Sequence, residues 1–211
     1  MPRSVPRPFL VLLFAVTACG PALQPLPPMA PLPELAPNAR APAPGGERAA
    51  ANTREAYPAL ESLRARGLMV PVRGVTAAQI HDTFDERRDG LRVHNAQDIL
   101  AKRGTPVLAA DDGTILHMGK NTLGGNVIWA TDRSKRLAFY YAHLEGYAKG
   151  LRDGQTVSRG DVIGFVGTSG NAPKDTPHLH FQLMRIVSGK RYSDGPPVNP
   201  LPFFTVQASA R

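Results

Sequence analysis

This 211-residue sequence has few of the residues that build the commonest disulfide and metal sites. It contains one Cys, at position 19, and one Trp. A single Cys can neither close an internal disulfide nor form a thiolate zinc cluster, so a bound metal would need His and carboxylate ligands. The His-Glu-x-x-His zinc motif is also absent. These absences exclude the best-known zinc sites but leave room for one built from His and Asp.

Long hydrophobic runs are lacking as well. The apolar run at residues 9–16 is far shorter than the roughly 20 residues that a membrane-spanning helix needs. It follows Arg3 and Arg7 and ends in small residues before Cys19, which is the pattern of an export signal. We therefore expect residues 1–18 to be a signal peptide.

The residues around Cys19 resemble the lipobox of bacterial lipoprotein signals. The segment Val16-Thr17-Ala18-Cys19 places the sole Cys where the lipid is attached. The resemblance implies lipidation of Cys19 and an exported lipoprotein anchored to a membrane and facing the periplasm. Gly20, rather than Asp, indicates the outer membrane in a Gram-negative cell. An ordinary signal peptide cut after Ala18 is the alternative, but it would leave an unpaired thiol in an exported protein.

Residues 19–47 are rich in Pro and Ala, and nine Pro residues there prevent both helix formation and sheet pairing. We expect a disordered linker that begins at the lipidated Cys19 and could reach roughly 90 Å, at about 3.1 Å per residue. A short helical approach segment is expected at 48–69, with Leu60 and Leu63 on its apolar face.

Residues 70–206 alternate short apolar runs with Gly-containing turns, and no long amphipathic helix competes with them. Asp-Gly and Gly-Gly pairs between apolar runs favour hairpins, because tight turns need backbone φ angles that these residues tolerate. We expect one mainly β domain with an antiparallel sheet. The clearest strands are 107–110, 127–130, 137–141 and 162–166, and the expected turns are Asp89-Gly90, Asp112-Gly113, Gly124-Gly125 and Asp153-Gly154.

The excess of positive charge limits the kinds of molecule that the chain is expected to bind. Residues 48–211 carry 22 Lys and Arg against 15 Asp and Glu, a net charge of +7. A basic surface attracts polyanions through electrostatics that salt screens. Nucleic acid is not expected as a partner, because the chain has an export signal and shows no basic helix or aromatic binding motif.

The most informative chemical pattern is Pro177-His178-Leu179-His180-Phe181-Gln182-Leu183. Its apolar alternation predicts a strand on which His178, His180 and Gln182 share one face. Side chains two residues apart stand about 6.6 Å apart along a strand. That spacing suits two ligands of one metal, or one ligand beside one catalytic base. A solvated strand face that carries two His residues by chance is an equal alternative.

A second pattern, Val93-His94-Asn95-Ala96-Gln97-Asp98-Ile99, places a His near an Asp. On a straight strand His94 and Asp98 would stand roughly 13 Å apart, too far for two bonds of about 2.0–2.2 Å to one zinc. A shared metal therefore requires a backbone bend, for which Asn95-Ala96 is a plausible place. Taken alone, the pattern favours a polar turn with local hydrogen bonds.

A third pattern, Phe139-Tyr140-Tyr141-Ala142-His143-Leu144, is an aromatic strand that ends in a His. Alternation puts Tyr141 on the same face as His143. Half-buried packing is the commoner fate of aromatic residues in a strand.

Together, the three patterns resemble the lysostaphin-type zinc peptidases of bacterial cell walls, whose domain is also called LytM. The resemblance spans roughly residues 70–204. It implies a fold like the duplicated hybrid motif and a zinc-dependent endopeptidase that cuts peptide cross-links between peptidoglycan stems. It also rests on Gly104-Thr105-Pro106-Val107, Asp112-Gly113, Gly154-Gln155-Thr156-Val157 and Gly160-Asp161-Val162-Ile163-Gly164.

The family pattern implies a role for five residues. One Zn²⁺ ion would be bound by His94, Asp98 and His180, while His143 and His178 would line the cleft as catalytic residues, one of them the general base. Two His and one Asp leave the fourth metal position open, as in catalytic rather than structural zinc sites. Which of the two cleft His residues accepts the proton stays open.

Three positions depart from the family pattern without removing a ligand: Asp85, Ala96 and Gln182 stand where Gly, Gly and Glu are frequent. One alternative function is a metal-free adaptor that activates a cell-wall amidase or acts with division proteins, although such relatives typically lack a ligand. Another is a lipoyl-carrier-like hairpin domain at 154–167, but its turn at Ser158-Arg159-Gly160 has no Lys to carry the group.

Several further polar residues are weaker candidates. Asn126 and Tyr141 are candidate substrate contacts. Three Arg residues could bind substrate carboxylates: Arg87, Arg88 and Arg92. For these three, and for His81 and His117, a solvated surface position is expected.

Overall fold

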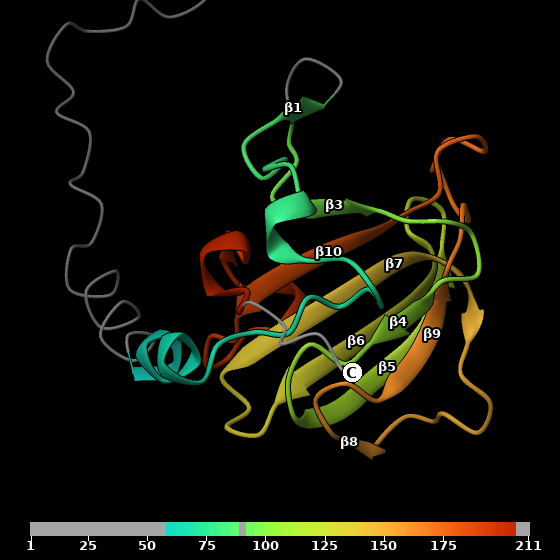
Figure 1. Ribbon diagram of the computed structural model, residues 1–211. Helices are drawn as coiled ribbons and strands as arrows, with labels where there is room; N and C mark the ends of the chain where they lie inside the picture. Colours follow the sequence, from blue (N-terminus) through green and yellow to red (C-terminus); the bar gives the residue numbers. More distant parts are fainter. Residues whose placement is uncertain (1–57, 89–91, 206–211) are drawn as a thin grey trace, which may run out of the picture. The chain divides into compact units, whose positions relative to one another are not determined.

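The computed structural model describes residues 58–88 and 92–205 (Figure 1). The predicted signal peptide, Cys19 and the Pro-rich linker lie outside the described residues. Residues 58–66 are helical, in the predicted approach segment. Leu63 is fully buried and Leu60 packs against the core. None of the helices in the described part of the chain could span a membrane.

An antiparallel sheet of nine strands forms most of the domain, as predicted. A separate hairpin pairs β1 (Arg87–Arg88) with β2 (Arg92–Val93). Three short 3₁₀ helices are η1 (Ala77–Gln79), η2 (Tyr192–Asp194) and η3 (Leu201–Phe203). The strands of the large sheet are β3 (Gln97–Leu100), β4 (Pro106–Leu108), β5 (Gly113–Asn121), β6 (Gly125–Asp132), β7 (Leu137–Tyr147), β8 (Thr156–Val157), β9 (Val162–Val166), β10 (His178–Arg185) and β11 (Pro197–Val198).

The long strand β7 lies at the centre of this sheet. Its first part pairs with β6 on one side and β10 on the other, and its last part, from Leu144, pairs with β9. Strand β10 lies in turn between β7 and β3 (Figure 1). Strand β10 therefore lies between the strands of the other two His patterns, although Asp98 and His180 are 82 positions apart in the chain.

The alternation predicted for β10 is confirmed and divides its two faces between the core and the site. Phe181 is fully buried, with its ring 6.2 Å from that of Phe139 and 5.2 Å from that of Tyr141. Burying a side chain of this size contributes roughly 1.5–3 kcal/mol. Leu179 and Leu183 are buried on the same face. This packing holds the opposite face of β10 in a single register.

The predicted hairpin turns have mixed outcomes. Gly124-Gly125 closes the hairpin between β5 and β6, as expected. The prediction of hairpin turns at Asp112-Gly113 and Asp153-Gly154 is wrong, because the strands on either side of each turn do not pair with each other. Strand β4 pairs with β9 and not with β5, and β8 pairs with β5 and not with β7. Gly113 is needed for close packing instead, since a Cβ there would come within 1.7 Å of the Thr131 carbonyl oxygen. Asp89-Gly90 lies outside the described residues, between the paired strands β1 and β2.

Gly125 should tolerate substitution far less well than Gly150. Both have left-handed backbones, with φ of +65° at Gly125 and +80° at Gly150. A Cβ added at Gly125 would lie 2.2 Å from Ser169 Oγ, whereas one added at Gly150 would have no atom within 4 Å. Both Ala variants carry the backbone cost of roughly 1–2 kcal/mol. We expect Gly125→Ala to lose about 1–3 kcal/mol more in the free energy of unfolding, because the contact overpacks the turn. Urea unfolding measures this difference, and equal losses would contradict the packing argument.

Candidate active site

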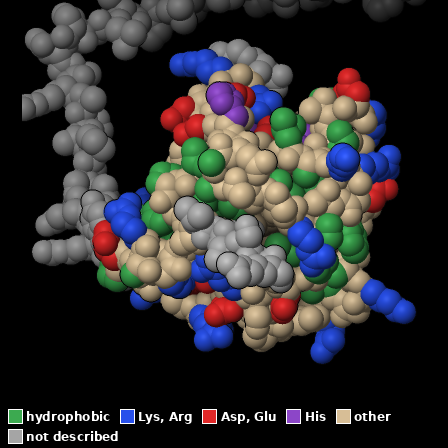
Figure 2. Space-filling view, in the orientation of Figure 1, with side chains coloured by type: hydrophobic (Ala, Val, Ile, Leu, Met, Phe, Trp, Pro, Cys, Tyr) green, Lys and Arg blue, Asp and Glu red, His purple; other side chains and the backbone are tan. Residues whose placement is uncertain are grey.

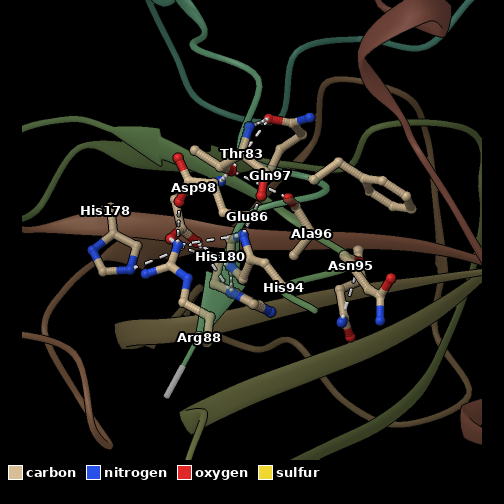
Figure 3. Close-up of polar contacts among 12 residues, drawn as sticks. Thr83, Glu86, Arg88, His94, Asn95, Ala96, Gln97, Asp98, His178 and His180 are labelled. Atoms are coloured by element: carbon tan, nitrogen blue, oxygen red, sulfur yellow. Dashed lines mark hydrogen bonds and ion pairs between the residues drawn. The ribbon is translucent and has the colours of Figure 1, made fainter. Parts of the chain in front are cut away.

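Three ligand-type atoms from His94, Asp98 and His180 meet on the outer face of the sheet (Figure 3). His94 Nε2, Asp98 Oδ1 and His180 Nδ1 lie 3.1 Å apart in all three pairs. Around a tetrahedral metal with bonds of about 2.0–2.2 Å, ligand atoms stand roughly 3.3–3.6 Å apart. The triangle is therefore close to the size that one zinc ion requires, and its mixed N and O donors suit that ion.

A backbone bend brings His94 and Asp98 together. Asn95, between them, has a left-handed φ of +56°, at the place where the sequence required a bend. Asp98 then enters β3, where it lies directly opposite His180 of β10. The bend brings the His94 and Asp98 donors together, and the pairing of β3 with β10 adds the His180 donor.

Thr83, which was not predicted to belong to the site, supports both residues of this bend. It is only 8% exposed. Its carbonyl oxygen accepts a hydrogen bond from His94 Nδ1 (2.8 Å), and its Oγ1 accepts one from the backbone N–H of Asp98 (3.0 Å). Because a carbonyl oxygen only accepts, His94 Nδ1 carries the proton and Nε2 keeps its lone pair for a metal. No motif marks Thr83, because its partners meet it only in the fold.

Arg88 also belongs to the site, which corrects the surface position expected for it. Its Nη2 donates to Asp98 Oδ2 (2.6 Å), leaving Oδ1 to face the two imidazoles (Figure 3). Its Nε is buried, and no described residue accepts its proton. Arg87 is exposed, as expected, whereas Arg92 is exposed but lines the cleft.

Replacing Arg88 with Met should weaken zinc binding. The guanidinium holds the outer carboxylate oxygen and so orients Oδ1 toward the metal position, and loss of such partners typically costs about 10–100-fold in metal affinity. Arg87→Met, which removes an equal charge from the neighbouring exposed position, is the control. Titration against a competing chelator measures both affinities. Unchanged or tighter binding in the Arg88 variant would show that the cation opposes the metal rather than orienting its ligand.

Two further imidazoles lie beside the triangle. The ring of His143 is 4.9 Å from that of His178 and 5.6 Å from that of His180. His143 Nδ1 donates to the carbonyl oxygen of Ser169 (2.9 Å), and His178 Nδ1 donates to that of Thr176 (2.8 Å). In each neutral ring Nε2 is therefore the atom left to accept a proton.

The electrostatics favour the neutral form of His143 and His180 and the ionised form of Asp98. Burial lowers the pKa of His143 to about 4, and burial also lowers the pKa of His180. For Asp98, burial works against ionisation, but the close ring nitrogens of His180 and His94 outweigh it and hold the pKa of the carboxyl far below its usual range. Neutral His and ionised Asp are the forms that bind a metal.

Two candidate substrate contacts lie elsewhere, which corrects the sequence-based expectation. Tyr141 is 1% exposed, and its OH accepts a hydrogen bond from the backbone N–H of Ala110 in the core. Simple alternation failed here because His143 has a left-handed φ of +61°, which turns it out of step with Tyr141. Asn126 does not line the cleft; its side-chain amide donates to the carbonyl oxygens of Leu144 and Glu145.

A cleft of about 760 Å³ contains these His residues and Asp98. Residues on β6, β7 and β10 line it, together with the segments 121–124 and 171–173. His81 and His117 are exposed and lie outside it, as expected.

On the face drawn in Figure 2, Lys and Arg side chains are interspersed with Asp and Glu rather than gathered in one patch.

Comparisons with known proteins agree with this geometry. The family described as Peptidase family M23 matches residues 92–200. The L-Ala--D-Glu endopeptidase of Bacillus subtilis (strain 168) is 41% identical over 123 residues, covering 55% of this chain and 37% of that protein. The DD-carboxypeptidase/endopeptidase Mpg of Neisseria meningitidis serogroup B (strain ATCC 13091 / M2091) is 36% identical over 110 residues, covering 52% and 22%. The crystal structure of a zinc containing peptidase from Vibrio cholerae has a TM-score of 0.52 and 26% identity, covering 64% of this chain and 39% of that one.

The matched segment contains the donor triangle of His94, Asp98 and His180 and both neighbouring His residues, whereas Thr83 and Arg88 precede it. The chain spans well under half the length of the two curated relatives. With more than half of its residues matched and the His-Asp-His triangle inside the match, the chain belongs to peptidase family M23.

Proposed function

We propose that this chain is a zinc-dependent endopeptidase that hydrolyses peptide cross-links of bacterial peptidoglycan. The observation that carries the proposal is the 3.1 Å triangle of donor atoms with two further imidazoles beside it. The names of relatives support the reaction class: L-Ala--D-Glu endopeptidase, glycyl-glycine endopeptidase ALE-1 of Staphylococcus capitis and peptidoglycan DD-endopeptidase ShyC of Vibrio cholerae. These names refer to different peptide bonds, so the cleft around the ligands must select the bond.

The donor set is suited to hydrolysis. His94, Asp98 and His180 would hold one zinc ion, which when bound would polarise the scissile carbonyl as a Lewis acid and lower the pKa of its bound water toward about 7. Three protein ligands leave a position open to water or substrate. The ionised Asp98 contributes one negative charge to the site.

His143 and His178 would carry the proton. Because carbonyl oxygens hold both Nδ1 protons, each ring accepts a proton at Nε2. One imidazole takes the proton of the attacking water at Nε2 and delivers it to the leaving amine. The other lies 4.9 Å away, ring to ring, and in its protonated form would donate from Nε2 to the developing oxyanion. Among the described residues that line the cleft, the only carboxylate is Asp98, so these imidazoles replace the Glu base of His-Glu-x-x-His enzymes.

Digestion of purified cross-linked sacculi tests the reaction. The zinc-loaded chain should release cross-linked stems as monomers, and chelator should stop the release. Analysis of the products separates cleavage of a cross-link from cleavage within a stem. Unchanged sacculi after treatment with a folded, zinc-loaded chain would contradict the proposal and favour an adaptor for an amidase.

We also propose that Cys19 anchors the exported chain to a membrane. The support is the sequence pattern at 16–19 and the sole Cys within it. Fractionation of cells should place the wild type with membranes and the Cys19→Ala variant in the soluble periplasmic fraction. A wild type found only in the soluble fraction would contradict the anchor.

A further inference from the structure

Beside the metal triangle, three aromatic residues form a cluster that the proposed reaction does not use. Trp129 of β6 lies with its ring 4.4 Å from that of Tyr140 on β7 and 5.3 Å from that of Tyr192 in η2. All three side chains are partly exposed. We call Trp129, Tyr140 and Tyr192 the aromatic platform.

The platform is continuous with the candidate active site. Tyr140 lies directly opposite Trp129 on one side and Gln182 on the other, so the three residues form one row across the sheet. The next row along β7 and β10 contains His180, and the rings of Tyr140 and His180 are 6.1 Å apart. Trp129, Tyr140 and Gln182 line the same cleft as the candidate metal ligands, and Tyr192 lies at its edge, next to the cleft-lining Ser193 and in ring contact with Trp129. A substrate held at the triangle would therefore extend over the platform.

The side chains next to Tyr140 in the cleft are uncharged. Asn121 donates to the Tyr140 hydroxyl (3.2 Å), and burial raises the pKa of Tyr140, which keeps the phenol protonated. Gln182 adds a second side-chain amide to this part of the cleft. The charged residues that line the cleft are Arg88, Arg92 and Asp98. Carboxylate-bearing parts of a substrate would be attracted to the Arg residues, whereas the platform suits an uncharged group with an apolar face and a polar edge.

We propose that the aromatic platform is a subsite for an N-acetylated amino sugar of the glycan strand. A pyranose ring has an apolar C–H face that packs on an aromatic ring, and its hydroxyl and acetamido edge matches side-chain amides. The inference rests on the proposed function, because peptidoglycan stems are carried on such sugars. A sugar on Trp129 would lie within about three extended residues of the triangle, at roughly 3.3–3.6 Å per residue.

The sole Trp of the chain makes this subsite directly observable. Tri-N-acetylchitotriose, which has no peptide, should change the fluorescence of Trp129 in a saturable way in both metal-free and zinc-loaded protein. Tyr192→Ala should weaken this binding by about threefold to tenfold, since it removes one aromatic contact. Tyr192→Phe, which keeps the ring, should bind like the wild type. Tyr147→Ala removes a partly exposed Tyr that belongs neither to the cleft nor to the platform, and it should leave sugar binding unchanged.

Each outcome bears on the inference separately from the reaction. No saturable change with the trisaccharide, or equal affinity in the wild type and Tyr192→Ala, overturns the subsite even if sacculi are digested. A response to a free stem peptide but not to the sugar assigns the platform to peptide and overturns the sugar assignment. Sugar binding that depends on Tyr192 in a protein that leaves sacculi intact supports the subsite and contradicts the proposed reaction.

Discussion

Replacing His180 with Ala should abolish zinc binding and hydrolysis together. The change removes one of three donor atoms that lie 3.1 Å apart and leaves two donors from one short segment. Loss of an outer-shell partner costs about 10–100-fold in metal affinity, so loss of a ligand itself should cost more than about 100-fold. Competition with a chelator measures the affinity, and digestion of sacculi measures the activity.

The control is His117→Ala, which removes an exposed imidazole outside the cleft and should change neither quantity. Asp98→Asn is a second variant, because it keeps the shape of the side chain and removes the charge. Folding is checked by circular dichroism, since His180 lies on the strand that also carries the buried Phe181. A folded His180→Ala protein that retains zinc with wild-type affinity would exclude His180 as a ligand.

Replacing His178 with Ala should separate the reaction from the metal. His178 Nε2 lies 3.8 Å from Asp98 Oδ1, next to the triangle but outside it. Proton transfer by a positioned side chain contributes typically about 10²–10⁴-fold. We expect a loss of that size in the rate of sacculus digestion, with zinc affinity changed only a few-fold, and the same result for His143→Ala.

The double variant tests whether the two imidazoles act as a unit. Residues that share one step give losses that do not add, so His143→Ala with His178→Ala should lose less than the product of the two single effects. Zinc affinity must be measured on every variant. Loss of zinc in either single variant would assign that His to the metal rather than to proton transfer.

Local patterns predicted the parts of the site that depend on neighbours in sequence. The alternation at residues 177–183 correctly placed His178 and His180 on the face opposite the core, because side chains on a strand alternate regardless of its partners. The distance between His94 and Asp98 required a bend, and Asn95 supplies it with its left-handed backbone. The mainly antiparallel fold was also predictable from short apolar runs between Gly-containing turns.

Contacts between distant segments could not be predicted in this way. Asp112-Gly113 has the composition of a hairpin turn, but the strand that follows it, β5, pairs with β6 and β8, not with β4. The left-handed φ of His143 breaks the alternation that placed Tyr141 beside it, and Tyr141 is buried in the core. A register shift or one unusual φ reverses which side chains reach the cleft, and neither leaves a clear mark in the local sequence.

The sequence by itself limited a metal site to His and carboxylate donors, because the chain has a single Cys, and the family resemblance implied which two His residues and one Asp these would be. Only the tertiary structure decided that the three donor atoms meet at 3.1 Å and that Thr83 and Arg88 hold two of the donors from outside the motif. The physical reason is range: alternation and backbone bends act over a few residues, whereas a metal site depends on the register between strands far apart in the chain. The aromatic platform follows the same rule, because Trp129, Tyr140 and Tyr192 become neighbours only through pairing of the sheet and the position of η2.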